Sequence, residues 1–230
     1  ATKALKNKDF NRLGELIYQS HHSLQDDYEV SCKELDYLVE FSKNKEYVLG
    51  SRIAVTDGAT LTIEAGTVIK GEAGTGANAT ALVIAQGGKL MAEGTATEPI
   101  IFTTTADDIT SGEINSPNMD ETLNGLWGGL IVLGKAPISA DAATAQIEGI
   151  PPSDVNGLYG GSDATDNSGV IRYVSVRHGG ANIGEGNEIN GITLGGVGSG
   201  TTIEYIEVVA NQDDGIEWFG VMRSFEAETL

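Results

Sequence analysis

The stretch KEYVLGSRIAVTDGATLTIEAG, residues 45–66, joins two unlike sequence patterns. Its first residues end a polar, Lys-rich segment. From Ile53 onward, Val, Ile and Leu alternate with small or polar residues, and Gly-containing turns interrupt them. Alternation of this kind over a few residues is typical of short β-strands. The sequence therefore predicts a change of fold inside this stretch.

The composition changes at the same place. Residues 1–53 hold 8 of the 14 Lys and Arg, 9 of the 33 Asp and Glu, and only 2 of the 31 Gly. Almost all of the net charge of -19 therefore falls in residues 54–230. This charge repels nucleic acid and anionic membrane surfaces, and it leaves cations and neutral glycans as partners.

The sequence shows no membrane-targeting pattern and little potential for cysteine chemistry. No run approaches the ~18 to 20 apolar residues that a membrane span needs, and no signal peptide begins the chain. A single cysteine, Cys32, excludes an internal disulfide and a cysteine-based zinc site.

The first segment has a helical period. Phe10, Leu13 and Ile17 recur at helical spacing, and Ser31 followed by Glu34 forms a capping box. We expect two amphipathic helices within residues 1–46. Because such a hairpin cannot bury its apolar stripes alone, it is a candidate cap for the segment that follows.

The second segment repeats itself loosely. Leu61 and Leu90 occupy matching places 29 residues apart, and Tyr173 and Tyr205 occupy matching places 32 residues apart. Repeats of this length, built from short strands and glycine corners, favour an all-β solenoid, the parallel β-helix. An antiparallel β-sandwich is the alternative. We expect the β-helix over 47–220 and a tail over 221–230.

Residues 9–40, DFNRLGELIYQSHHSLQDDYEVSCKELDYLVE, resemble the C-terminal part of galactokinases, and YVLGSRI (47–53) continues the likeness. That family continues with a glycine run, which AVTDGATLT replaces here. Its phosphate-binding loop and catalytic Arg/Asp pair come from earlier segments. The resemblance therefore implies a galactokinase-derived fragment without kinase activity.

LTIEAGTVIKGE (61–72), WGGLIVLGKAPI (127–138), IRYVSVRHGGA (171–181) and NQDDGIEWFG (211–220) resemble surface or secreted proteins of Bacteroidetes-type bacteria. Those proteins carry a right-handed, pectate-lyase-like parallel β-helix. The resemblance implies an extracellular or cell-surface location and contact with glycans. Because YVLGSRI fits both families, the chain reads as a chimera joined there.

Paired carboxyl groups divide acid and base work in polysaccharide hydrolysis. Asp213 and Asp214 are therefore candidate catalytic residues, with Arg177 and His178 in the preceding repeat. The alternative is that the aspartates form a strand-end turn and that Arg177 and His178 pair with them across neighbouring coils.

Aromatic residues and acidic corners supply the remaining candidates. Trp127, Tyr159 and Trp218 are candidates for stacking on sugars, with close packing as the alternative. Acidic corners suit calcium, but no Asp-x-Asp-x-Asp-Gly loop is present. We therefore expect no cofactor and keep calcium as an alternative.

The sequence as a whole favours a non-catalytic scaffold or binding module that contacts polysaccharide or a cell-surface partner. The alternatives are a polysaccharide lyase or hydrolase using Asp213 and Asp214, and an inactive galactokinase-derived fragment. We expect no nucleic-acid partner. An uncapped coil at the C-terminal end also predicts end-to-end self-association.

Overall fold

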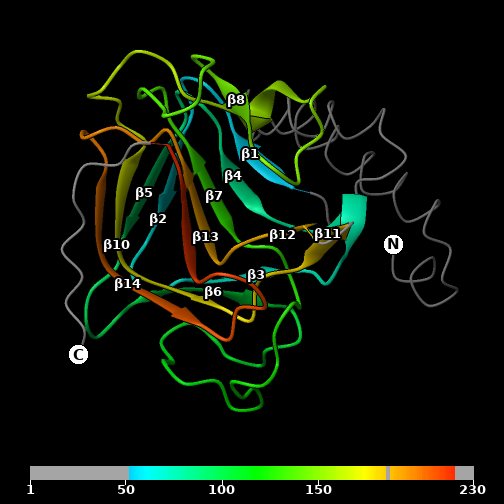
Figure 1. The fold of residues 1–230 in the computed structure, drawn as a ribbon. Helices are drawn as coiled ribbons and strands as arrows, with labels where there is room; N and C mark the ends of the chain where they lie inside the picture. Colours follow the sequence, from blue (N-terminus) through cyan, green and yellow to red (C-terminus); the bar gives the residue numbers. More distant parts are fainter. Residues whose placement is uncertain (1–51, 185–186, 221–230) are drawn as a thin grey trace, which may run out of the picture. The chain divides into compact units, whose positions relative to one another are not determined.

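The computed structural model describes residues 52–184 and 187–220 (Figure 1). Contacts divide the chain into two units, Ala1–Leu49 and Gly50–Leu230, and the described residues all belong to the second. The strands are β1 (Ile53–Val55), β2 (Thr60–Ile63), β3 (Val68–Gly71), β4 (Leu82–Ile84), β5 (Lys89–Glu93), β6 (Ile100–Thr104), β7 (Leu130–Leu133), β8 (Ala145–Gln146), β9 (Leu158–Tyr159), β10 (Gly169–Arg177), β11 (Asn182–Gly184), β12 (Asn187–Glu188), β13 (Ile192–Gly195), β14 (Thr202–Val209) and β15 (Ile216–Phe219).

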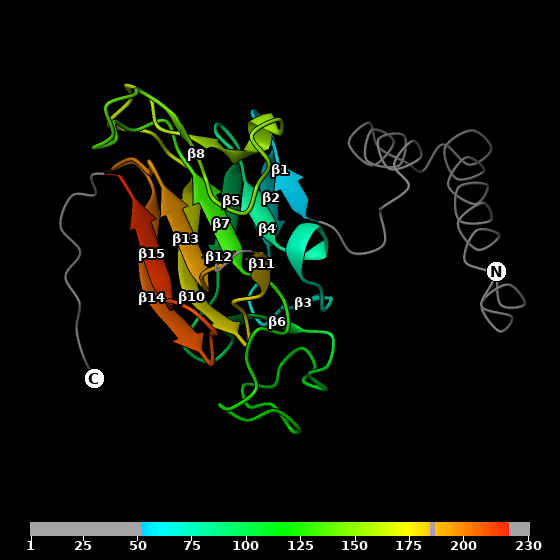
Figure 2. The same ribbon diagram turned by 45° about the vertical axis from the view of Figure 1, so that its right-hand side comes forward.

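Five strands form an all-parallel sheet in the order β1-β4-β7-β13-β15, which lie side by side in Figure 2. The register stacks residues of like chemistry on one another. One interior row runs through Val55, Ile84, Val132 and Leu194 and ends at Trp218. Alternate residues of each short strand therefore face the interior, as period-two alternation dictates.

The second parallel sheet has the order β2-β5-β10-β6-β3, with β14 paired to β10. β10 is long because it pairs with two different strands along its length. Its first residues, 169–172, pair with β5, and residues 174–176 pair with β6. β10 and β14 each bend once between these two portions, at Tyr173 and Tyr205, which both have positive φ angles.

The space between the two sheets is filled by the main hydrophobic core. Phe102 lies in a row with Ile69, Val176 and Val208, so residues far apart in sequence stack on one another. Phe102 is fully buried. Complete burial of a side chain of this size contributes roughly 1.5–3 kcal/mol.

A second apolar cluster covers the outer face of the five-stranded sheet. Two antiparallel pairs, β8–β9 and β11–β12, belong to the segments that cover it. Ile131 and Leu133 of β7 project into this cluster, and Ile147 and Tyr159 come from the segment above. All four strand residues of β7 are therefore buried, which explains its unbroken apolar run.

Close stacking of coils explains several of the glycines. A Cβ atom added to Gly88 would lie 2.2 Å from the backbone oxygen of Val55 in the preceding coil. No side chain fits there without moving the backbone. The Gly-rich composition after residue 53 thus reflects close approach of backbone to backbone at the corners.

The predicted fold class, an all-β right-handed solenoid with an N-terminal two-helix segment, is wrong as stated. The described residues contain no α-helix, only two short 3₁₀ turns, Gly76–Asn78 and Val155–Gly157. Their strands form two parallel sheets and two antiparallel pairs, which no single uniform winding describes. The helical period is confined to residues 1–46, which lie outside the described residues. From Arg52 onward the sequence period is two, which forms strands and not helices.

The parallel pairing rejects the antiparallel sandwich, and it aligns the sequence echoes as expected. Leu61 lies opposite Leu90, and the ring of Tyr173 stacks on that of Tyr205. The predicted tail, 221–230, also lies outside the described residues.

Candidate functional site

The bends of β10 and β14 form an exposed aromatic corner. The rings of Tyr173 and Tyr205 stack with centroids 4.4 Å apart and planes 5° apart. Both residues adopt left-handed backbone angles, φ 49° and 53°, which are uncommon for side chains of this size. Such a stack contributes about 0.5–1.5 kcal/mol beyond burial, so the pair helps to hold the bend.

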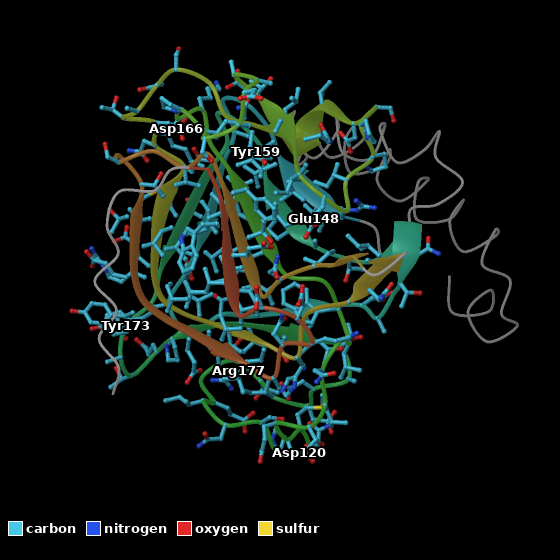
Figure 3. All side chains as sticks on the ribbon, viewed as in Figure 1. Asp120, Glu148, Tyr159, Asp166, Tyr173 and Arg177 are labelled. Carbon is cyan, nitrogen blue, oxygen red and sulfur yellow. The ribbon has the colours of Figure 1, made fainter. Side chains whose placement is uncertain are left out.

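This corner leaves a large aromatic surface in solvent. Tyr205 is 66% exposed, and Tyr173 lies at the outer edge of the molecule, at the left of Figure 3. Because β14 is the outermost described strand on this side of the sheet, no further strand of the described residues follows Tyr205.

Charged side chains flank the aromatic corner. Arg172 lies 3.0 Å from Glu204 and 3.6 Å from Glu93, so its guanidinium is held between carboxylates of two neighbouring strands. All three side chains are substantially exposed. Pairs of this kind contribute about 0.2–1 kcal/mol, so their groups remain available to a ligand.

On the other side of the bend, Arg177 is an anchor for a loop. Its Nε donates to Ser175 Oγ at 2.7 Å, and one terminal nitrogen donates to the Ile114 carbonyl at 2.6 Å. A second terminal nitrogen lies 3.3 Å from Glu207. The guanidinium thus ties the loop of residues 105–129 to β10 and β14.

His178 is also engaged by that loop. It is buried, and its Nδ1 lies 2.6 Å from the Leu123 carbonyl. Its backbone accepts a hydrogen bond from Leu126 and donates one to Val209.

Asp213 and Asp214 lie in the turn between β14 and β15, and both are exposed. The neighbouring Gln212 donates its backbone N–H to Gly179, so this turn stacks directly on the corner that follows His178. The side chains of Arg177 and His178 have their hydrogen-bond partners elsewhere. The structure therefore brings the two backbones together without pairing the four candidate side chains.

The three predicted aromatic residues occupy different settings. Trp127 is buried, stacks on Phe102 with centroids 6.5 Å apart, and donates its indole N–H to the Arg177 carbonyl. Tyr159 is buried against the edge of Phe219. Trp218, at the last described strand, is 42% exposed.

Residues 33–224 match the family model for the pectate-lyase-like β-helix domain. This match covers most of the chain. The chain belongs to that family.

The β-helix family match overlaps a second one. Residues 1–63 match the model for the C-terminal domain of GHMP kinases. The Thermotoga neapolitana galactokinase is 51% identical over 53 residues, which are 23% of this chain and 15% of that protein. The Bos taurus galactokinase is 53% identical over 53 residues, 23% of this chain and 14% of that protein.

The chain therefore combines a β-helix domain with a short galactokinase-like segment, and the two matches share residues 33–63. The composite character expected from the sequence is thus supported. The chain spans about 15% of the length of the curated relatives it matches. No solved structure matches it significantly.

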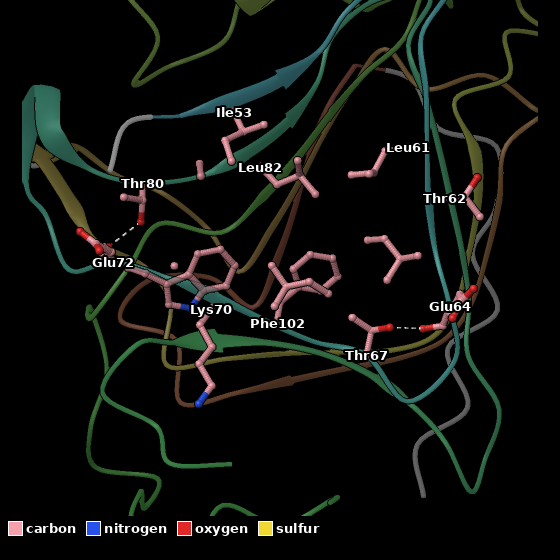
Figure 4. Close-up of a pocket in the computed structure, with 15 residues that line it drawn as sticks. Ile53, Leu61, Thr62, Glu64, Thr67, Lys70, Glu72, Thr80, Leu82 and Phe102 are labelled. Atoms are coloured by element: carbon pink, nitrogen blue, oxygen red, sulfur yellow. Dashed lines mark hydrogen bonds between the residues drawn. The ribbon is translucent and has the colours of Figure 1, made fainter. Parts of the chain in front are cut away.

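The β-helix also contains a cavity of about 700 Å³ at its first coil (Figure 4). Its walls are largely apolar and include Leu61, Ile63, Phe102 and Trp127. Two hydroxyl groups in its lining already have hydrogen-bond acceptors within the chain. Thr67 donates to the Glu64 carbonyl, and Thr80 donates to the Glu72 carbonyl. Recognition of a polar ligand needs converging polar groups, so the cavity is a weaker candidate than the aromatic corner.

The acidic Asp107 of the 105–129 loop is held by hydrogen bonds from nearby residues and not by a shared cation site. Asp107 accepts hydrogen bonds from Thr103, Ser116 and Ile109. Burial alone would raise its pKa, but these bonds outweigh burial and place the pKa below 3.8. Within the described residues, no group of three His, Cys, Asp or Glu side chains is arranged to hold a metal.

Sequence reasoning used Tyr173 and Tyr205 only as markers of the repeat. Their 32-residue spacing equals the length of one coil, which is the signal that the two aromatic rings would stack on each other. Whether the stacked rings would face the core or solvent depended on where each strand bends.

Proposed function

We propose that this chain is a non-catalytic glycan-binding module that acts outside the cell or at its surface. Its ligand is a neutral polysaccharide that lies on the Tyr173–Tyr205 corner. The observation that carries this proposal is the stacked tyrosine pair with its outer ring 66% exposed.

The chemistry of the corner suits a sugar. A pyranose ring offers a face of C–H groups that packs on an aromatic ring, and hydroxyls at its rim that need hydrogen-bond partners. Arg172 supplies donors and Glu204 supplies acceptors beside the rings. Because the pair is already stacked, binding would cost little side-chain ordering.

Charge selects among sugars. Polymers of uronic acids carry a carboxylate on each residue, and a chain of net charge -19 repels them. Neutral glucans, galactans and mannans carry no such penalty.

The absence of catalysis is supported by the positions of the acidic candidates. Asp213 and Asp214 are exposed in a turn, and Arg177 and His178 hold the 105–129 loop. General acid catalysis requires a group positioned against its reacting partner, and hydrogen bonds to the loop occupy the two basic groups.

The test is calorimetric titration with soluble neutral glucan, galactan and mannan, and with polygalacturonate and alginate. We expect at least one neutral polymer to bind and the uronates not to. Tyr205→Ala should weaken binding about 10-fold, which is about 1.4 kcal/mol. The matched control is Val155→Ala, at an apolar side chain that is 75% exposed outside the corner.

Equal binding by the Tyr205→Ala and Val155→Ala proteins would contradict the proposal. An enzyme would instead release reducing ends or unsaturated products from one of these polymers. Activity that disappears in Asp214→Asn would establish the hydrolase or lyase alternative.

The location and the galactokinase-like segment complete the proposal. The β-helix family supports an extracellular setting, and no helix of the described residues is long and apolar enough to cross a membrane. The segment similar to galactokinases contributes no kinase activity, so ATP-dependent phosphorylation of galactose by the full chain would contradict this part.

A further inference from the structure

The apolar cavity at the first described coil is large enough to hold a small molecule. Its volume is about 700 Å³, and small-molecule sites span ~300–1,000 Å³. Its sides come from four strands, through Ile53 of β1, Leu61 of β2, Ile69 of β3 and Leu82 of β4 (Figure 4). Ile53 is 62% exposed, so the cavity opens to solvent beside this residue. A ligand can therefore reach it from outside.

The cavity is already formed in the absence of a ligand. Parallel pairing of β1 with β4 and of β3 with β6 fixes the strands that carry its sides. At its floor, Trp127 stacks on the buried ring of Phe102 and donates its indole N–H to the Arg177 carbonyl at 2.7 Å. The indole lies so close to β3 that a Cβ atom on Gly71 would be 2.6 Å from it. Because these walls are ordered beforehand, binding loses little conformational entropy.

Several polar groups along the cavity have their hydrogen-bond partners elsewhere in the chain. The Thr67 and Thr80 hydroxyls donate to backbone carbonyls. Lys70 Nζ donates to the Asp107 carbonyl, and Figure 4 shows it pointing away from the cavity. These groups do not hold water inside the cavity firmly. An apolar ligand group that displaces poorly held water gains affinity.

Charge at the rim restricts the ligand further. Glu64 and Glu72 are both exposed and lie on opposite sides of the cavity (Figure 4). An anionic ligand meets these two carboxylates in a protein of net charge -19. A cationic ligand loses its hydration against the apolar walls. The cavity therefore favours a ligand without charge.

We infer that this cavity binds an uncharged, hydrocarbon-rich small molecule. The body of the ligand lies between Ile53, Leu61 and Leu82, above the Trp127 ring. The cavity and the Tyr173–Tyr205 corner share no residue, so this site is independent of the sugar-binding proposal.

The site is tested in the full chain with two fluorescent probes that share one aromatic skeleton. N-phenylnaphthylamine is uncharged, and anilinonaphthalene sulfonate is an anion. We expect the uncharged probe to bind with increased fluorescence, and the anion to bind about 10-fold more weakly because of the rim carboxylates. The double variant Glu64→Gln/Glu72→Gln keeps the shape of both side chains. It should reduce the difference between the probes about 5-fold while leaving the uncharged probe unaffected.

Two variants of the walls locate the uncharged probe. Ile53→Glu places a carboxylate at the mouth of the cavity and should weaken binding about 10-fold. Its matched control is Val155→Glu, at an apolar side chain that is 75% exposed outside the cavity, and binding there should be unchanged. Leu82→Ala removes contacts without adding charge and should weaken binding about 3-fold or more. Thermal unfolding by circular dichroism checks that each variant is folded.

The outcomes separate the cavity from other places where an apolar probe can bind. Parental affinity in both Ile53→Glu and Leu82→Ala, or no binding to the parent chain, overturns the inference. Loss of binding in Trp218→Glu with parental affinity in Ile53→Glu places the probe on the last described coil and also overturns it. So does probe binding that falls as light scattering detects association, because a second copy then occupies the cavity. Tyr205→Ala should lose glycan binding and keep probe binding, so the two proposals fail separately.

Discussion

At the scale of single residues, Asp166 shows how its surroundings set the ionisation of a carboxyl group. It is 7% exposed, and Ser168 Oγ donates to it at 3.3 Å. Burial raises its pKa above 3.8, and hydrogen bonds from the Lys135 backbone and Ser168 offset this only in part. Its folded-state pKa therefore exceeds its unfolded value.

This shift predicts a pH dependence with a definite sign. A carboxyl group with a raised folded pKa stabilises the fold most below its unfolded pKa, and this contribution is lost as pH rises through the folded pKa. Asp166→Asn, which cannot ionise, should therefore gain stability relative to the parent as pH rises from about 3 to 7. Urea unfolding at a series of pH values measures the difference.

Asp163→Asn is the control with the opposite sign. Hydrogen bonds from Thr165 lower the pKa of Asp163 below 3.8. That carboxylate stabilises the fold above its unfolded pKa, so its replacement should lose stability relative to the parent as pH rises. The same direction for both variants would refute this assignment.

At the scale of structural elements, the loop of residues 105–129 depends on a few contacts with β10. Arg177 donates to the Ile114 carbonyl, and His178 bonds the Leu123 carbonyl. Lys70 of β3 donates to the Asp107 carbonyl from another strand. A long loop without strands of its own is ordered mainly by such contacts.

Arg177→Ala should therefore release the middle of this loop while leaving the strand ladders intact. We expect amide hydrogen exchange in residues 108–124 to become about 10-fold faster, a cost of about 1.4 kcal/mol in local opening. Arg172→Ala, at the exposed pair on the other side of the bend, is the control and should leave loop exchange unchanged. Unchanged exchange in Arg177→Ala would show that other contacts order the loop.

At the scale of the whole molecule, the last described coil raises the question of association between copies. β14 and β15 are outermost in their sheets among the described strands. Trp218 continues the interior row of Val132 and Leu194 but is 42% exposed. An edge of this kind is a template for pairing with another chain.

We propose that the net charge of -19 opposes this association and that salt permits it. The Debye length falls from about 10 Å at 0.1 M to about 3 Å at 1 M salt, so repulsion between copies weakens. Light scattering should show a larger mass at 1 M than at 0.1 M salt in the parent but not in Trp218→Glu. A monomer at both salt concentrations would contradict self-association at this edge.

Sequence patterns predicted much of the β-rich part because coil stacking repeats local chemistry. The pairs Leu61–Leu90 and Tyr173–Tyr205 align as their spacing indicates. The contacts of individual side chains were harder to predict from the sequence. One interpretation of the sequence paired Arg177 and His178 with the aspartates of the next coil, but both side chains bind a loop that begins more than 60 residues earlier in the sequence.

The sequence by itself determined the strand period, the glycine corners, the acidic charge and the junction of two families, because each depends on neighbouring residues or on composition. Only the tertiary structure decided which side chains meet. Asn190 reaches Glu217 through a strand register set by the whole sheet, and Tyr205 is exposed because no described strand lies beyond β14. Contacts between distant residues depend on how every intervening coil stacks, and no local pattern contains that information.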